Sequence, residues 1–215
     1  MATIRKILFS PLRPFTVLAE AFLARQTVAS EYKGVKICHS GLHLWCNDEF
    51  TSAVERALRL IDEKDALRFA RIKRVIHYVR PMTLSGDTAA EYVRHSKLCY
   101  MDWPMIQSPD DPSLTVLSSA ILLVHEATHG LLHSRGVRHS KARRPLIERL
   151  CVDEEARFLM RVDPEMSKIW VEVRKPAYQV TSSNRGLVTD IREHVASFKY
   201  TLGRNSEKGL SIWKD

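Results

Sequence analysis

The segment "AILLVHEATHGLLHSRG", residues 120–136, places His125, Glu126 and His129 inside an apolar run. Residues four apart lie on the same face of a helix, so the imidazoles of His125 and His129 can be directed at one point. Two converging imidazoles suit a tetrahedral divalent metal, above all zinc. Glu126 would flank the metal and act as general base toward a zinc-activated water. The HExxH spacing therefore predicts a catalytic site with one Zn²⁺ per chain.

A catalytic zinc needs a third protein ligand and keeps its fourth position for water. The extended form HExxHxxGxxH is excluded, because Leu132 and Arg135 stand where it requires Gly and His. His133 continues the same helical row but lies two turns from His125, so we expect it at the rim of the site or behind the ligands.

A carboxylate from the next helix is the other solution, with Glu148, Glu154 and Glu155 as candidates. Glu148 follows His129 by 19 residues, which leaves room for a helix end, a loop and a return turn. We take Glu148 as the predicted ligand and keep Glu154 and Glu155 as alternatives. Glu155 shares a helical face with Glu148 and Cys151, and we expect it to orient a zinc-bound imidazole.

"VHEATHG" followed by "IERLCVDEEARF" resembles the gluzincin type of HExxH zinc metallopeptidase, including small bacterial proteins of this type. The resemblance covers roughly residues 70–160. It implies a His-His-Glu zinc site completed from the following helix, and a zincin-like fold in which a strand before the active helix lines the substrate cleft. "EYVRHSKLCYMDW" is similar to that strand in position. The chain departs from many gluzincins at Val152, where they have Asp four residues after the ligand Glu.

The surrounding pattern predicts an α+β fold: a small sheet packed on the buried HExxH helix, with a second helix supplying Glu148. Residues 32–46 and the segments 71–79 and 91–101 are predicted as extended. Apolar spacing from Phe50 to Ile61 predicts a helix that Asn47 or Asp48 begins. Asp111 and Pro112 begin the HExxH helix, which Gly136 ends. Further helices are predicted over 146–162 and 165–173.

Three regions are predicted in the 215 residues: a helical extension over 1–30, a zincin-like metallopeptidase domain over 31–179, and a polar tail over 180–215. The apolar stripe near the N-terminus is more typical of a docking helix than of a membrane anchor. Tyr178 and His194 are weak candidates for stabilising an oxyanion.

The formal net charge of +8 comes from scattered Lys and Arg without a nucleic-acid motif. Nucleic-acid binding is therefore disfavoured, as is peripheral membrane contact, and a peptide or protein is the expected substrate. Four cysteines without a CxxC pair predict free thiols and a cytoplasmic location. The alternative to a hydrolase is a non-catalytic zinc-binding protein whose basic loop, residues 135–144, contacts an acidic partner.

Overall fold

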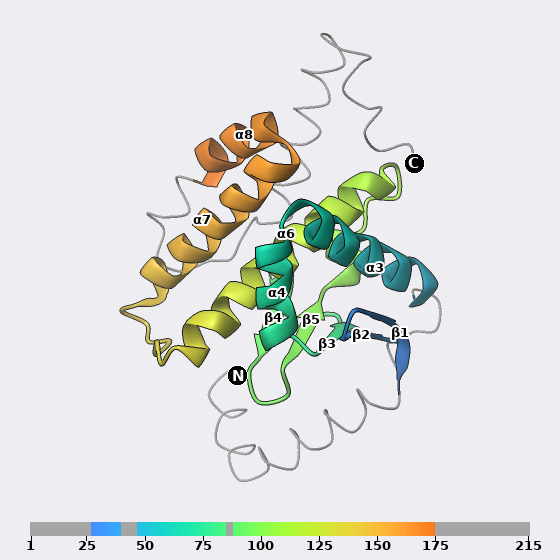
Figure 1. The fold of residues 1–215 in the computed structure, drawn as a ribbon, viewed down its shortest axis with the longest axis horizontal. Coiled ribbons are helices and arrows are strands. Elements are labelled where there is room, and N and C mark those ends of the chain that lie inside the picture. Colours follow the sequence, from blue (N-terminus) through green and yellow to red (C-terminus); the bar gives the residue numbers. More distant parts are fainter. Residues whose placement is uncertain (1–26, 40–46, 85–87, 175–215) are drawn as a thin grey trace, which may run out of the picture.

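The computed structural model describes residues 27–39, 47–84 and 88–174, which form an α+β fold with a small mixed sheet (Figure 1). The sheet has the order β1-β2-β3-β5-β4. Its strands are β1 (Val28–Tyr32), β2 (Val35–Cys38), β3 (Tyr78–Pro81), β4 (Ala90–Val93) and β5 (Leu98–Met101). The two outer pairs are antiparallel and the two inner pairs are parallel. β4 is consequently an edge strand.

Sequence patterns misplaced two strands. The segment 71–79 was predicted as extended, but helix α4 (Ala66–Val75) occupies its first half and β3 begins only at Tyr78. α4 continues because Phe69, Ile72 and Val75 recur at helical spacing and bury one face in the core. The single strand predicted over 91–101 is instead the hairpin β4–β5, whose turn contains Lys97 at φ 51°.

Helix α3 (Asn47–Lys64) begins where it was predicted, and Asp65 separates it from α4. The Asp65 side chain accepts a hydrogen bond from the backbone N–H of Arg68 at 3.2 Å, which caps the second helix. α3 packs against the sheet and against the HExxH helix, α6.

Helix α6 (Pro112–Ser134) confirms the predicted start and stop. Asp111 accepts hydrogen bonds from the N–H groups of Ser113 and Leu114, and Pro112 occupies the first turn. Gly136 follows the last turn at φ 80°, a conformation that favours glycine. By length and composition α6 could cross a membrane, but 89% of its most apolar window is buried inside the fold. That burial is typical of a core helix.

The other helices that the structure describes are α5 (Trp103–Ile106), which is a single turn, α7 (Arg144–Val162) and α8 (Pro164–Arg174). α7 and α8 match the predicted helices, and Pro145 lies in the first turn of α7. α7 packs along α6 on one side and against α8 on the other.

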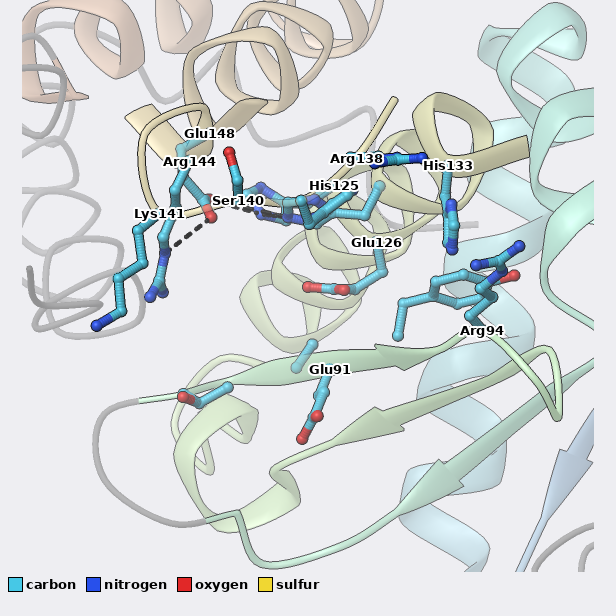
Figure 2. A pocket seen from close by; sticks show the side chains of 15 residues that line it. Glu91, Arg94, His125, Glu126, His133, Arg138, Ser140, Lys141, Arg144 and Glu148 are labelled. Atoms are coloured by element: carbon cyan, nitrogen blue, oxygen red, sulfur yellow. Dashed lines mark hydrogen bonds and ion pairs between the residues drawn. The ribbon is translucent and has the colours of Figure 1, made fainter. Parts of the chain in front are cut away.

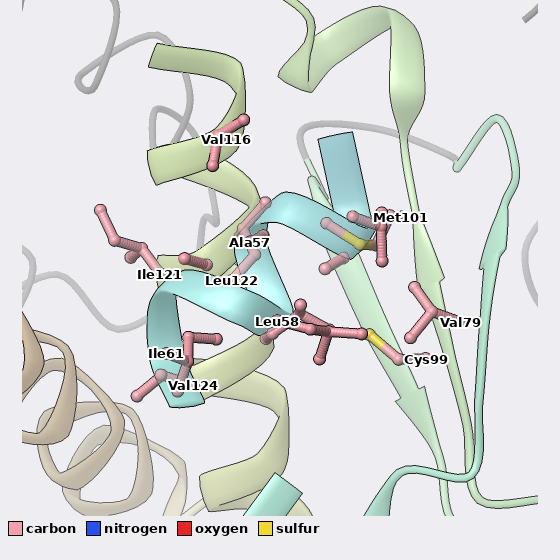
Figure 3. Close-up of a cluster of buried hydrophobic side chains, with 14 of the residues drawn as sticks. Ala57, Leu58, Ile61, Val79, Cys99, Met101, Val116, Ile121, Leu122 and Val124 are labelled. Carbon is pink, nitrogen blue, oxygen red and sulfur yellow. The ribbon is translucent and has the colours of Figure 1, made fainter. Parts of the chain in front are cut away.

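The core between sheet and helices fixes the position of α6 (Figure 3). Val79, Cys99 and Met101 from the strands meet Leu58 of α3, and all four side chains are 0% exposed. Each such side chain contributes roughly 1.5–3 kcal/mol of burial free energy. The segment that carries His125, Glu126 and His129 therefore sits on a helix anchored by the hydrophobic core.

The sheet begins at Val28, inside the range 1–30 predicted as an extension. β1 pairs with β2 from Val28 to Tyr32, so residues 28–30 belong to the folded unit. Residues 1–26 of the predicted extension, the polar tail over 180–215, Tyr178 and His194 lie outside the described residues.

Candidate metal centre

Helix α6 presents His125, Glu126 and His129 where its apolar part ends. His125 and Glu126 are buried, with 7% and 6% of their surface exposed, and His129 is half-buried. The ring nitrogens Nε2 of His125 and His129 are 3.0 Å apart. Two imidazoles bound to one tetrahedral zinc would be separated by about 3.3 Å at zinc–nitrogen bonds of about 2.0–2.1 Å. The two rings therefore have the relative placement that a shared metal requires.

Glu148, in the second turn of α7, completes a convergent set. Its Oε2 lies 3.5 Å from Nε2 of His125 and 3.8 Å from Nε2 of His129. Its other oxygen is 3.6 Å from Nε of Arg144, one turn earlier on α7. The structure thus brings the predicted ligands together across the α6–α7 contact.

Glu155 lies behind His125, on the side away from Glu148. Its Oε1 accepts the hydrogen bond of Nδ1 of His125, and its Oε2 accepts one from Nε1 of Trp170 at 2.9 Å. Because Nδ1 donates this hydrogen bond, a neutral His125 keeps its Nε2 lone pair for a metal. Glu155, which is 0% exposed, thereby fixes the ring in the orientation predicted for a ligand.

Glu154 does not reach the site. Its carboxylate pairs with Arg68 at 2.7 Å and Arg71 at 2.8 Å on α4, and with Arg157 on its own helix. The rotation of about 100° between neighbouring helical residues separates it from Glu155. Of the three glutamates kept open by the sequence, the geometry therefore leaves Glu148 facing both imidazoles.

Cys151 is a further donor that the sequence placed on the same face but gave no role. One ligand atom each from His125, His129 and Cys151 lie within 4.8 Å of one another, and this group can hold a metal ion. Burial and the nearby carboxylates, first among them Glu148, raise the pKa of the Cys151 thiol. The thiol is therefore protonated unless a metal displaces its proton.

The cluster favours positive charge where the ligand atoms converge. Burial opposes a charged His125, yet its hydrogen bonds to the Glu148 and Glu155 carboxylates outweigh burial and raise the pKa of His125 to about 10. Burial opposes ionisation of Glu148, but His125 outweighs it and lowers the Glu148 pKa to about 2. Burial and the His125 charge lower the pKa of His129 to about 3. The Glu148 and Glu155 carboxylates thus hold a proton on His125. A divalent cation would bring more positive charge to the same place and would replace that proton, so the donor set fits a divalent metal.

Glu126 points to the other side of the helix, toward strand β4 (Figure 2). Burial, helped by the Glu148 and Glu91 carboxylates, raises its pKa to about 7, although His125 and a backbone hydrogen bond from Tyr92 act in the opposite direction. A carboxyl group with a pKa near neutrality can both accept and return a proton.

A pocket of about 850 Å³ opens beside these groups. The edge strand β4 supplies one wall, with Ala90, Glu91 and Tyr92, and the α6–α7 loop supplies another. His133 also lines the pocket, with its ring 6.0 Å from that of His139. His139, 5.3 Å from the His129 ring, was missed because it stands in an irregular loop without periodic spacing.

Gly130 lets α6 approach this wall closely. A Cβ there would lie 2.9 Å from Cβ of Val75 and 3.1 Å from Cε1 of Tyr92. The Tyr92 hydroxyl in turn donates to the Val75 carbonyl at 3.0 Å. The small residue one position after the HExxH motif therefore sets the spacing between α6 and the edge strand β4.

No protein-family model, curated protein or solved structure matches this chain.

Proposed function

We propose that this protein is a zinc-dependent metallopeptidase-like hydrolase of zincin-like fold, acting on a peptide or protein. The observation that carries the proposal is the convergence of His125 Nε2, His129 Nε2 and Glu148 Oε2 within 3.8 Å of one another. Two imidazoles and one carboxylate, with an open fourth position, are the usual ligands of zinc in a hydrolase. One zinc per chain would be held between α6 and α7.

The arrangement of β4 supports the same proposal. β4 is an edge strand, it borders the pocket, and its Tyr92 amide contacts the Glu126 carboxylate. An exposed edge binds an extended peptide by main-chain hydrogen bonds. A peptide lying along β4 would pass beside both Glu126 and the ligand cluster.

The side chains around the centre would have different roles in the proposed hydrolysis. Zinc, when bound, supplies Lewis-acid polarisation of a carbonyl and of water. Glu126 takes a proton from the attacking water at its carboxylate and later returns it to the leaving amine, with its raised pKa suiting both transfers. Glu155 holds the His125 ring, and Trp170 holds Glu155.

The second candidate is a non-catalytic zinc-binding protein, and Cys151 is the observation that favours it. If its thiolate joined the other three ligands, the metal would have four protein donors, as closed structural zinc sites do. The exposed basic loop, residues 135–144, would then contact an acidic partner.

Glu126→Gln tests the hydrolase directly. The variant should keep its zinc content and fold while losing about 10²–10⁴-fold of peptide hydrolysis, because it removes only a proton-transfer group. Zinc is measured by elemental analysis and hydrolysis by mass spectrometry of a proteome-derived peptide library. Glu63→Gln, which changes the same charge at an exposed position on α3 outside the pocket, is the control and should retain activity.

Equal activity of Glu126→Gln and wild type would remove Glu126 from the mechanism. Absence of any cleaved peptide with full zinc content would favour the non-catalytic candidate.

A further inference from the structure

The walls of the pocket carry several basic side chains. Its lining residues include four basic side chains, namely Arg94, Arg138, Lys141 and Arg144. Arg144 neighbours Glu148, whereas the side chains of the other three make no ion pair with any residue that the structure describes. All four are exposed, and Arg94, Arg138 and Lys141 are available to a ligand entering the pocket.

The acidic lining residues do not neutralise this rim. The acidic residues that line the pocket are Glu91, Glu126 and Glu148. Glu126 and Glu148 belong to the candidate metal centre. Glu148 already interacts with His125, His129 and Arg144. Glu126 is buried below the rim. Only Glu91 remains to oppose three unpaired cations.

The cations occupy opposite ends of the cleft. In Figure 2, Lys141 and Arg144 lie at one end and Arg94, at the end of β4, lies at the other, with Glu126 between them. An extended chain running along β4 would therefore meet a basic side chain on each side of Glu126.

We propose that the pocket selects extended peptides with acidic side chains on both sides of the position facing Glu126. Arg94 recognises one acidic group, and Lys141, at the opposite end of the pocket, recognises the other. This inference rests on the proposed function, because it takes the pocket as the substrate cleft. A peptide is favoured over a nucleic acid because Glu91, Glu126 and Glu148 line the same pocket and would repel a continuous row of phosphates.

Binding to two peptide pools tests the proposal without depending on cleavage. The zinc-loaded Glu126→Gln protein is titrated into fluorescein-labelled degenerate decapeptides that contain Asp and Glu at four positions, and into the same pool with Asn and Gln there. The acidic pool should bind at least about tenfold more tightly at low salt and lose most of that advantage at high salt.

In the same background, Arg94→Gln and Lys141→Gln should each weaken binding of the acidic pool about three- to tenfold and leave the amide pool unchanged. Arg74→Gln is the matched control, since it removes the same charge from an exposed position on α4 outside the pocket.

Equal affinity for the two pools, or an equal effect of Arg74→Gln, would overturn the proposal. A single-stranded oligonucleotide that displaces the acidic pool at lower concentration than unlabelled acidic peptide would also overturn it, in favour of a nucleic-acid surface. The two proposals fail separately: wild-type protein that cleaves both pools equally contradicts the acidic preference alone, whereas selective binding without cleavage contradicts the hydrolase alone.

Discussion

At the scale of single residues, the centre depends on the protonation of His125. Hydrogen bonds to two carboxylates raise its pKa to about 10, so at neutral pH the metal-free ring is charged. Zinc needs a neutral imidazole, and its binding must therefore expel this proton. His129, with a pKa lowered to about 3, and Glu148, with a pKa lowered to about 2, have no proton to lose.

Zinc binding at pH 6 should accordingly release about one proton per chain, and the affinity should rise about tenfold per pH unit as the proton becomes easier to remove. Calorimetry in buffers of different ionisation enthalpy measures the number. Release of two protons, reduced to one by Cys151→Ser, would instead identify the Cys151 thiolate as a ligand. Binding without proton release would contradict the role of His125.

At the scale of elements, the site depends on how α7 meets α6. Glu148 and Glu155 are two turns apart on α7 and lie on opposite sides of His125, one facing Nε2 and the other Nδ1. Glu154, rotated by about 100° from Glu155 around the helix, ties α7 to Arg68 and Arg71 of α4. Three neighbouring glutamates thus have distinct structural roles.

Glu155→Gln should lower zinc affinity about 10- to 100-fold, because it removes the charge that holds the His125 ring. Competition with a fluorescent chelator measures the loss. Glu154→Gln, the adjacent control, should cost folding stability through its arginine partners and leave zinc affinity nearly unchanged. An equal loss of zinc affinity in both variants would show that α7 as a whole had shifted.

Sequence patterns located the parts of this centre that obey local rules. Asp111, Pro112 and Gly136 delimit α6, and helical spacing aligns His125 with His129 and Glu148 with Glu155. Sequence patterns failed where packing between distant segments of the chain determines the structure. The β-branched residues Ile72 and Val75 are helical because α4 packs on α6. No spacing rule separates Glu148 from Glu154 before the contact of α6 with α7 is known. The position of His139 could not be predicted for the same reason, because it depends on the path of an irregular loop.

At the scale of the whole molecule, α6 lies between two parts of the fold and packs against both. One side packs against α3, α4 and β4, and the other side against α7, which leads to α8 (Figure 1). A metal held by His125, His129 and Glu148 would crosslink these parts. Because zinc would bind only the folded arrangement, its binding free energy would add to the stability of the fold.

Removal of zinc with a chelator should therefore lower the midpoint of thermal unfolding by about 10 °C, on the order expected when a ligand at 1,000 times its Kd stabilises a domain of this size. Differential scanning calorimetry measures the shift. Glu148→Ala should unfold near the midpoint of the chelated wild type and respond little to the chelator. A wild-type unfolding midpoint that the chelator leaves unchanged would show that a metal at this centre does not stabilise the fold.

X-ray absorption at the zinc edge tests the central claim, a zinc held by His125, His129 and Glu148 with an open fourth position, most directly. The zinc-loaded protein should show only nitrogen and oxygen neighbours at about 2.0–2.2 Å, with the imidazole scattering of two histidines. Glu148→Ala should lose the metal or one oxygen neighbour, and Cys151→Ser should leave the spectrum unchanged. A sulfur neighbour at about 2.3 Å that disappears in Cys151→Ser would contradict the open catalytic site.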